Sequence, residues 1–112
     1  MDRDKLFEDL KTWILQLPSV TQASHRFGGT EFTLGRRELG HVHGDYQADI
    51  PFPMNVRNQL IAKGRAEPHH VLPKSGWITL RFRNADDVEK AIGLFRLSYD
   101  LANRKTIPAE LE

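Results

Sequence analysis

The spacing of apolar residues changes along the chain, from a helical period at both ends to a period of two in the middle. Residues 4–17 and 86–101 each carry an apolar stripe at helical spacing, and a shorter stripe covers 56–63. Between residues 30 and 52, and again over 77–83, apolar and polar side chains alternate as they do on strands. This order predicts an α+β domain, with an antiparallel sheet of about four to five strands and helices packed on one face, in the order α-β-β-β(-β)-α-β-α.

The length of 112 residues suits one domain, and we expect residues 1–112 to share a single core. The absence of cysteine excludes disulfide scaffolds, thiolate zinc sites and cysteine nucleophiles. No apolar run resembles a signal peptide or approaches the ~20 residues of a membrane span, so we expect a cytoplasmic protein without membrane contact. The sequence leaves the oligomeric state open.

All five histidines lie in the middle of the chain. Residues 25–84 hold nine basic against five acidic side chains, a balance of +4, whereas both flanks are mildly acidic. Histidine is the side chain that titrates near neutral pH. A functional site is therefore expected in this middle segment.

One predicted strand carries two histidines on the same face. His41 and His43 are two residues apart, so their side chains project together, with roughly 7 Å between their Cβ atoms. Arg37 and Asp45 share that face if the strand is unbroken, whereas Gly40 on the opposite face is small enough for a helix to lie close. We expect so polar a face to be exposed rather than part of the core. Replacing both histidines by alanine is then expected to change stability by less than ~0.5 kcal/mol.

A second pair, His69 and His70, lies in a loop between two prolines. Adjacent residues of an extended segment point in opposite directions, so only one of this pair is expected to join His41 and His43. Three histidines suit Zn²⁺ or Fe²⁺, and a His-x-His pair opens the metal site of cupins. A cupin continues with a glutamate at short spacing, and this chain has none there. We therefore assign no metal ligands among these residues, and a metal-binding histidine cluster is the less favoured alternative.

Binding to nucleic acid is not expected. The net charge of +1 argues against a general polyanion binder. Segment 74–82 is similar to the central strand of an RNA-recognition domain, but that strand needs aromatic residues at alternating positions to stack bases. Thr79 stands where the second aromatic residue belongs.

Several segments of the middle region resemble one known family. They are residues 37–43, 48–53, 63–64, 68–73 and 76–79, within a similarity that runs from Gly28 to Tyr99. These segments are similar to the luciferase-like domain family of small bacterial domains, whose distant relative is the luciferase of bioluminescent fungi. The fungal enzyme oxidises a hydroxylated styrylpyrone with O₂ and needs no metal or organic cofactor. The resemblance implies an oxygenase-like oxidoreductase, such as a monooxygenase, that acts on a phenolic or pyrone-like small molecule without a cofactor.

Two functions are open for these residues. An enzyme of this kind needs a base that ionises an electron-rich substrate and groups that stabilise reduced oxygen. The expected catalytic residues are the base His41 or His43, its orienting carboxylate Glu38 or Asp45, and the anion-stabilising Arg37 or His69. Substrate contacts are expected from Trp77 as an apolar wall and from Asp45, Asp49 and Lys63. In the alternative, the same residues form a non-catalytic module that binds a ligand or a protein partner.

Overall fold

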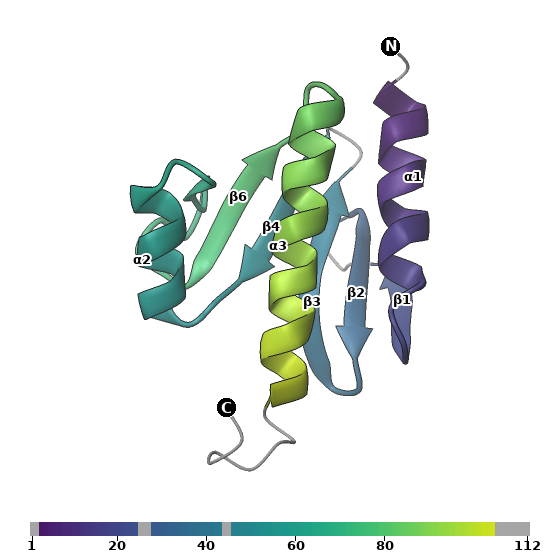
Figure 1. Ribbon diagram of the computed structural model, residues 1–112, viewed down its shortest axis with the longest axis horizontal. Coiled ribbons are helices and arrows are strands. Elements are labelled where there is room, and N and C mark those ends of the chain that lie inside the picture. Colours follow the sequence, from purple (N-terminus) through teal and green to yellow (C-terminus); the bar gives the residue numbers. More distant parts are fainter. Residues whose placement is uncertain (1–2, 25–27, 44–45, 105–112) are drawn as a thin grey trace.

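The computed structural model describes residues 3–24, 28–43 and 46–104, which form one six-stranded antiparallel sheet and three helices (Figure 1). The elements are α1 (Arg3–Leu15), β1 (Val20–Ser24), β2 (Thr30–Leu34), β3 (Arg37–His43), β4 (Gln47–Pro51), α2 (Met54–Ala62), β5 (Glu67–Pro68), β6 (Trp77–Arg81) and α3 (Ala85–Arg104). The predicted α+β class is confirmed, with six strands rather than the four to five expected. Strand β1 was not predicted because all of its residues but Val20 are exposed. Strand β5 was not predicted because it has only two residues.

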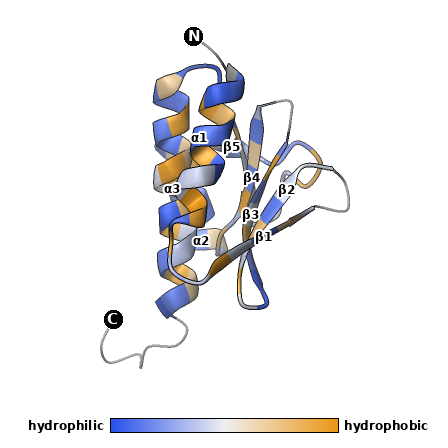
Figure 2. Cartoon of the chain, turned by 90° about the vertical axis from the view of Figure 1, so that its right-hand side faces the viewer, coloured by the Kyte–Doolittle hydropathy of each residue, from blue (hydrophilic) through white to orange (hydrophobic). Residues whose placement is uncertain are grey.

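Helices α1 and α3 cover one face of the sheet, and within the described ranges the opposite face carries no helix (Figure 2). The apolar side chains of both helices and of the covered sheet face form the core. Helix α2 lies beside α3 near the β5–β6 edge (Figure 1). Among the described residues, no helix has the length and apolar character needed to cross a membrane.

The strand order β1-β2-β3-β4-β6-β5 places β4 between β3 and β6. Across these three strands His41 pairs with Asp49, and Asp49 pairs with Thr79. Residues directly opposite each other on neighbouring strands lie on the same face of the sheet. The register therefore directs these three polar side chains to the helix-free face.

Strand β3 contains a bulge that reverses its alternation. Glu38 and Gly40 pair with consecutive residues of β2, so Leu39 between them is an extra residue. A bulge shifts the facing of the residues beyond it. Leu39 packs on the helix side, and Glu38 lies on the helix-free face, where it contacts His41. The strand is thus not unbroken, and Arg37 lies on the helix side.

Gly40 allows α3 to pack directly against β3. Its φ is +153°, and a Cβ atom at this position would lie 2.7 Å from Cε1 of Phe95 and 3.0 Å from the backbone oxygen of Asp49. Both distances are shorter than the ~3.5 Å of an ordinary carbon contact. The expectation that a small residue here lets a helix lie close is confirmed.

The start of α3 is held by reciprocal hydrogen bonds. Oδ1 of Asn84 accepts the backbone N–H of Asp87 (3.0 Å), and Oδ2 of Asp87 accepts the backbone N–H of Arg83 (3.0 Å). The Nε–H of Arg83 donates to the same carboxylate oxygen (3.2 Å). Burial alone would raise the pKa of Asp87, but these interactions with Arg83 outweigh it, so the pKa lies below its usual value.

We expect Asp87→Asn to lower the free energy of unfolding at pH 7 by about 1–2 kcal/mol, since it weakens charge-assisted bonds at the helix start. A carboxyl group whose folded-state pKa is lowered contributes stability above its unfolded pKa, and this stability is lost as the pH falls through the folded pKa. The difference between the two proteins should therefore shrink below about pH 4. Urea unfolding at pH 7 and pH 3 tests this, and a difference that stays constant would contradict it.

Candidate functional site

Asp49 lies at the centre of the helix-free face and is almost completely buried, with 1% of its surface exposed. It belongs to β4, whose neighbours β3 and β6 contribute side chains from both sides. The loop after β5 contributes two histidines. We call the resulting group the Asp49 cluster; it comprises Asp49, Glu38, His41, His43, Gln47, His69, His70 and Thr79.

One carboxylate oxygen of Asp49, Oδ2, faces the two histidines of β3. It lies 2.7 Å from Nε2 of His43 and 3.2 Å from Nε2 of His41. The other ring nitrogen of His41, Nδ1, lies 2.7 Å from Oε2 of Glu38. His41 is thus held between two carboxylates, a contact that exists because the bulge at Leu39 turns Glu38 to this face.

The second oxygen of Asp49, Oδ1, faces β6 and the loop after β5. The hydroxyl of Thr79 donates to it (2.8 Å), and Nε2 of Gln47 donates to it more weakly (3.3 Å). Nε2 of His69 and Nδ1 of His70 lie farther away, at 3.7 and 3.9 Å. The buried carboxylate therefore has polar partners on every side.

His69 and His70 both join the cluster, so the expectation that only one of them would do so is wrong. The chain turns at this point instead of continuing extended. Nδ1 of His69 accepts the backbone N–H groups of Val71 (3.1 Å) and Leu72 (3.0 Å), which closes the turn. The two imidazoles stack with their centroids 4.4 Å apart.

Trp77 forms the apolar border of the cluster. Its ring centroid lies 5.3 Å from that of His41 and 6.2 Å from that of His69. The indole therefore lies beside a histidine of β3 and a histidine of the loop after β5. Its role as an apolar wall for a substrate stays a prediction.

Burial and charge act against each other in this cluster. Burial alone would lower the pKa of His41, but the hydrogen bonds to Asp49 and Glu38 outweigh it and raise the pKa to about 9. Burial alone would raise the pKa of Asp49, but its hydrogen bonds with His41, Thr79 and His43 hold the pKa far below the usual range. Burial lowers the pKa of His69, against the attraction of Asp49. The two carboxylates therefore favour the cationic form of His41, whereas burial favours the neutral form of His69.

The expectation of an exposed face is wrong for His41, which has 7% of its surface exposed, and its neighbour Asp49 is buried as well. Burial of a polar group costs free energy only when the group lacks hydrogen-bond partners. His41 and Asp49 have such partners, so both can be buried. The side chains of His43 and His70 are more accessible, at 22% and 43%. A ligand can therefore reach the cluster from the side of these two histidines.

Two residues named in the sequence analysis, Arg37 and Lys63, are not part of this cluster. Arg37 makes no hydrogen bond or ion pair with it among the residues that the structure describes. Lys63 is exposed at the end of α2 and lines a hollow between α2 and α3. Asp45 lies outside the described residues.

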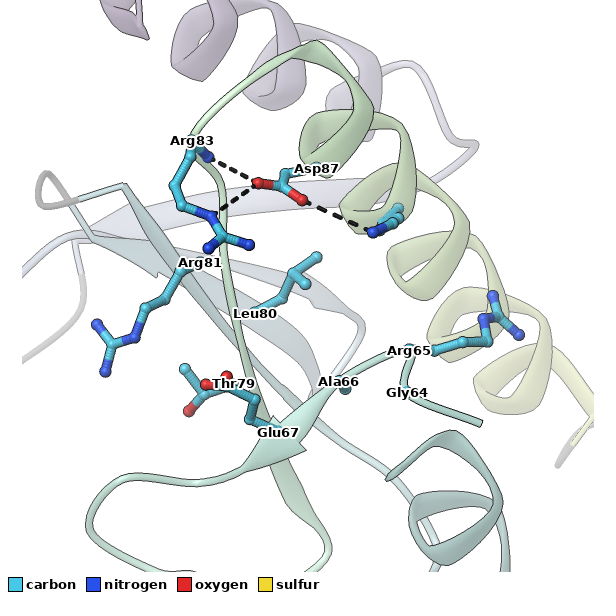
Figure 3. A pocket seen from close by; sticks show the side chains of 10 residues that line it. Gly64, Arg65, Ala66, Glu67, Thr79, Leu80, Arg81, Arg83 and Asp87 are labelled. Atoms are coloured by element: carbon cyan, nitrogen blue, oxygen red, sulfur yellow. Dashed lines mark hydrogen bonds and ion pairs between the residues drawn. The ribbon is translucent and has the colours of Figure 1, made fainter. Parts of the chain in front are cut away.

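Two hollows lie in the described surface, and Thr79 is the one residue of the Asp49 cluster that lines either of them. One is at the β5–β6 edge beside the start of α3, where Glu67, Arg81 and Asp87 are among the lining residues (Figure 3). The other lies between α2 and α3. Neither hollow contains a histidine. A pocket lined by the histidines therefore stays a prediction.

Comparison with known proteins agrees with the resemblance found in the sequence. A family model described as Luciferase domain matches residues 36–98. The chain belongs to the luciferase domain family. No curated protein and no solved structure matches it.

The segment matched in this luciferase domain contains every residue of the Asp49 cluster. Sequence reasoning had not assigned His70, Gln47 and Thr79 to the site. The alternation in β4 was a usable signal, because it places Gln47 and Asp49 on one face. Thr79 shares its strand face with Trp77 by the same rule. No local signal could show that the loop carrying His70 turns back over this face.

Proposed function

We propose that this luciferase domain binds a phenolic or pyrone-like small molecule at the Asp49 cluster and oxidises it with O₂. The observation that carries the proposal is the gathering of four imidazoles around one buried carboxylate on the helix-free face. Membership of the luciferase domain family supports oxygen chemistry as the type of reaction.

The cluster has groups that suit an electron-rich aromatic substrate. Imidazole N–H groups donate hydrogen bonds to a phenolate or enolate oxygen, and they stabilise the negative charge that develops when oxygen is reduced. Trp77 presents an aromatic ring beside His41 and His69, on which a flat substrate ring can pack. The partly exposed His43 and His70 are the residues that an incoming molecule meets first.

The alternative is a non-catalytic module that binds a ligand or a protein partner through the same face. One observation favours it, because neither of the two hollows described above contains a cluster histidine. Enzymes bind most small substrates in concave sites that exclude water. Binding without oxidation is the result that would establish this alternative.

Oxygen uptake by the full chain should be screened with phenolic and pyrone compounds. We expect uptake with at least one of them, and His43→Ala should lower kcat/KM at least about tenfold, as loss of one hydrogen bond to a charged group does. Arg96→Ala, at an exposed position of α3, serves as the control and should retain the rate. Binding of a compound without uptake would contradict the oxygenase and support the binding module.

A further inference from the structure

We infer that Nε2 of His41, Nε2 of His43 and Oδ2 of Asp49 bind one divalent transition-metal ion. This inference goes beyond the proposed function and does not depend on it, because metal binding is measured without turnover. It also departs from the sequence analysis, which assigned no metal ligands. Each of the three residues offers a ligand atom within 4.8 Å of those of the other two.

The separations of these atoms are those of a coordination sphere. Metal–ligand distances of ~2.0–2.2 Å place neighbouring ligand atoms about 3.0 Å apart in an octahedron and about 3.4 Å apart in a tetrahedron. Oδ2 of Asp49 lies 2.7 Å from Nε2 of His43 and 3.2 Å from Nε2 of His41. Shifts of a few tenths of an ångström would therefore admit an ion.

The hydrogen bonding of His41 presents a lone pair to this position. A carboxylate only accepts hydrogen bonds, so Nδ1 of His41, 2.7 Å from Glu38, carries a hydrogen. In the neutral imidazole the lone pair of Nε2 then points to Oδ2 of Asp49, which also has only lone pairs to offer. A cation between them, either a proton or a metal ion, removes this repulsion. Carboxylate–histidine pairs such as Glu38–His41 commonly orient metal-binding imidazoles.

A second group of three, Asp49 with His69 and His70, is geometrically close but chemically unsuited. Nδ1 of His69 accepts two backbone N–H groups, so in neutral His69 the hydrogen is on Nε2, the atom that faces Asp49. An Nε2–H group cannot bind a metal, and the two backbone donors at Nδ1 of His69 keep the hydrogen on Nε2. This histidine therefore serves as a hydrogen-bond donor toward Asp49. The hydrogen through which Nε2 of His43 contacts Asp49 must instead leave as a proton when the ion binds.

The orientation of Gln47 excludes His70 in the same way. Oε1 of Gln47 accepts from Nη1 of Arg81 (2.9 Å), so its amide NH₂ group faces the cluster. That NH₂ group lies 3.2 Å from Nδ1 of His70, which accepts a hydrogen from it. The lone pair of Nδ1 is then already used. His70 therefore serves as the control: it is a histidine of the same cluster that should not bind the ion.

The ligand types indicate the class of metal. Two imidazole nitrogens and one carboxylate oxygen suit Fe²⁺ or Zn²⁺, whereas Ca²⁺ and Mg²⁺ prefer oxygen ligands alone. Three protein ligands leave coordination positions for water or a bound molecule. The accessible side of the cluster, at His43, is where these positions would open.

The test uses the full chain without an affinity tag, dialysed against EDTA and then freed of EDTA. Co²⁺ is titrated while the visible d–d absorption is recorded, and Zn²⁺ is titrated by calorimetry. We expect one ion per chain, and His43→Ala should weaken binding by more than the 10–100-fold loss that follows removal of an outer hydrogen-bond partner. Glu38→Gln should weaken binding within that range, and His70→Ala should leave it unchanged.

Absence of Co²⁺ and Zn²⁺ binding at millimolar concentration would overturn the inference. So would a folded His43→Ala that binds as tightly as the unaltered chain, or loss of binding in His70→Ala alone. Circular dichroism shows whether each variant folds; if His43→Ala does not, His43→Gln keeps most of the side-chain volume and takes its place. If the chain binds Co²⁺ but oxidises no compound, the metal site is supported and only the proposed oxygenase activity is contradicted.

Discussion

Replacing Asp49 by alanine is expected to lower the free energy of unfolding by about 3–5 kcal/mol, the range seen when one partner of a buried ion pair is removed. The carboxylate is 1% exposed and lies within hydrogen-bonding distance of His43 and Thr79. Its loss removes the carboxylate that His43 and Thr79 contact and leaves His41 with one carboxylate instead of two.

Urea unfolding at pH 7 in the presence of EDTA measures this effect on the metal-free chain. Asp9→Ala is the control, because Asp9 is an exposed carboxylate paired with Lys5 on the surface of α1. Such pairs contribute about 0–1 kcal/mol. A loss below about 1 kcal/mol in Asp49→Ala would show that the cluster does not stabilise the fold. The small loss of stability predicted for replacing both His41 and His43 by alanine must be revised upward, because His41 is buried.

Phe95→Ala is expected to destabilise the fold by a similar amount, about 3–5 kcal/mol, through loss of buried area and creation of a cavity. Phe95 is fully buried on α3 and packs edge-on against Phe32 of β2, with 6.0 Å between the ring centroids. Its ring also fills the space above Gly40. The cavity would open between α3 and the strand that carries the histidines.

The same urea experiment tests this prediction, with Val71→Ala as its control. Val71 is an apolar residue with 67% of its surface exposed, so its truncation should change the free energy of unfolding by less than ~0.5 kcal/mol. Equal effects of the two substitutions would contradict the packing of α3 on β3. Because Phe95 lies on the helix side, its variant also shows how far the Asp49 cluster depends on the core behind it.

The position of Asp49 on a central strand explains how the domain can hold a group of partly buried charges, whose burial costs free energy. A central strand has paired neighbours on both sides, so its residues move little and their partners arrive in fixed register. Sites built on strands are held more precisely than sites on loops. The helices take the apolar face, which leaves the other face free for polar side chains (Figure 2).

The class of fold and the shared face of His41 and His43 could be predicted from the amino-acid sequence alone. Apolar spacing in residues 4–17 and 86–101 marked the two helices that cover the sheet, and the His-x-His spacing placed His41 and His43 together. These features follow from local geometry, since the periods of helices and strands decide which side chains share a face. Strand β1, largely exposed at the sheet edge, had no such pattern to reveal it.

The surroundings of these histidines could not be predicted without the folded chain. The bulge at Leu39 brings Glu38 to His41 and takes Arg37 away, and the strand order places Asp49 between β3 and β6. The turn at His69 returns both loop histidines to the same carboxylate. The bulge and the strand order depend on pairing between strands, and a shift of one residue in that pairing reverses every side chain on the strand. Local periodicity carries no information on such register, which is why Asp49 emerged as the centre only in the folded chain.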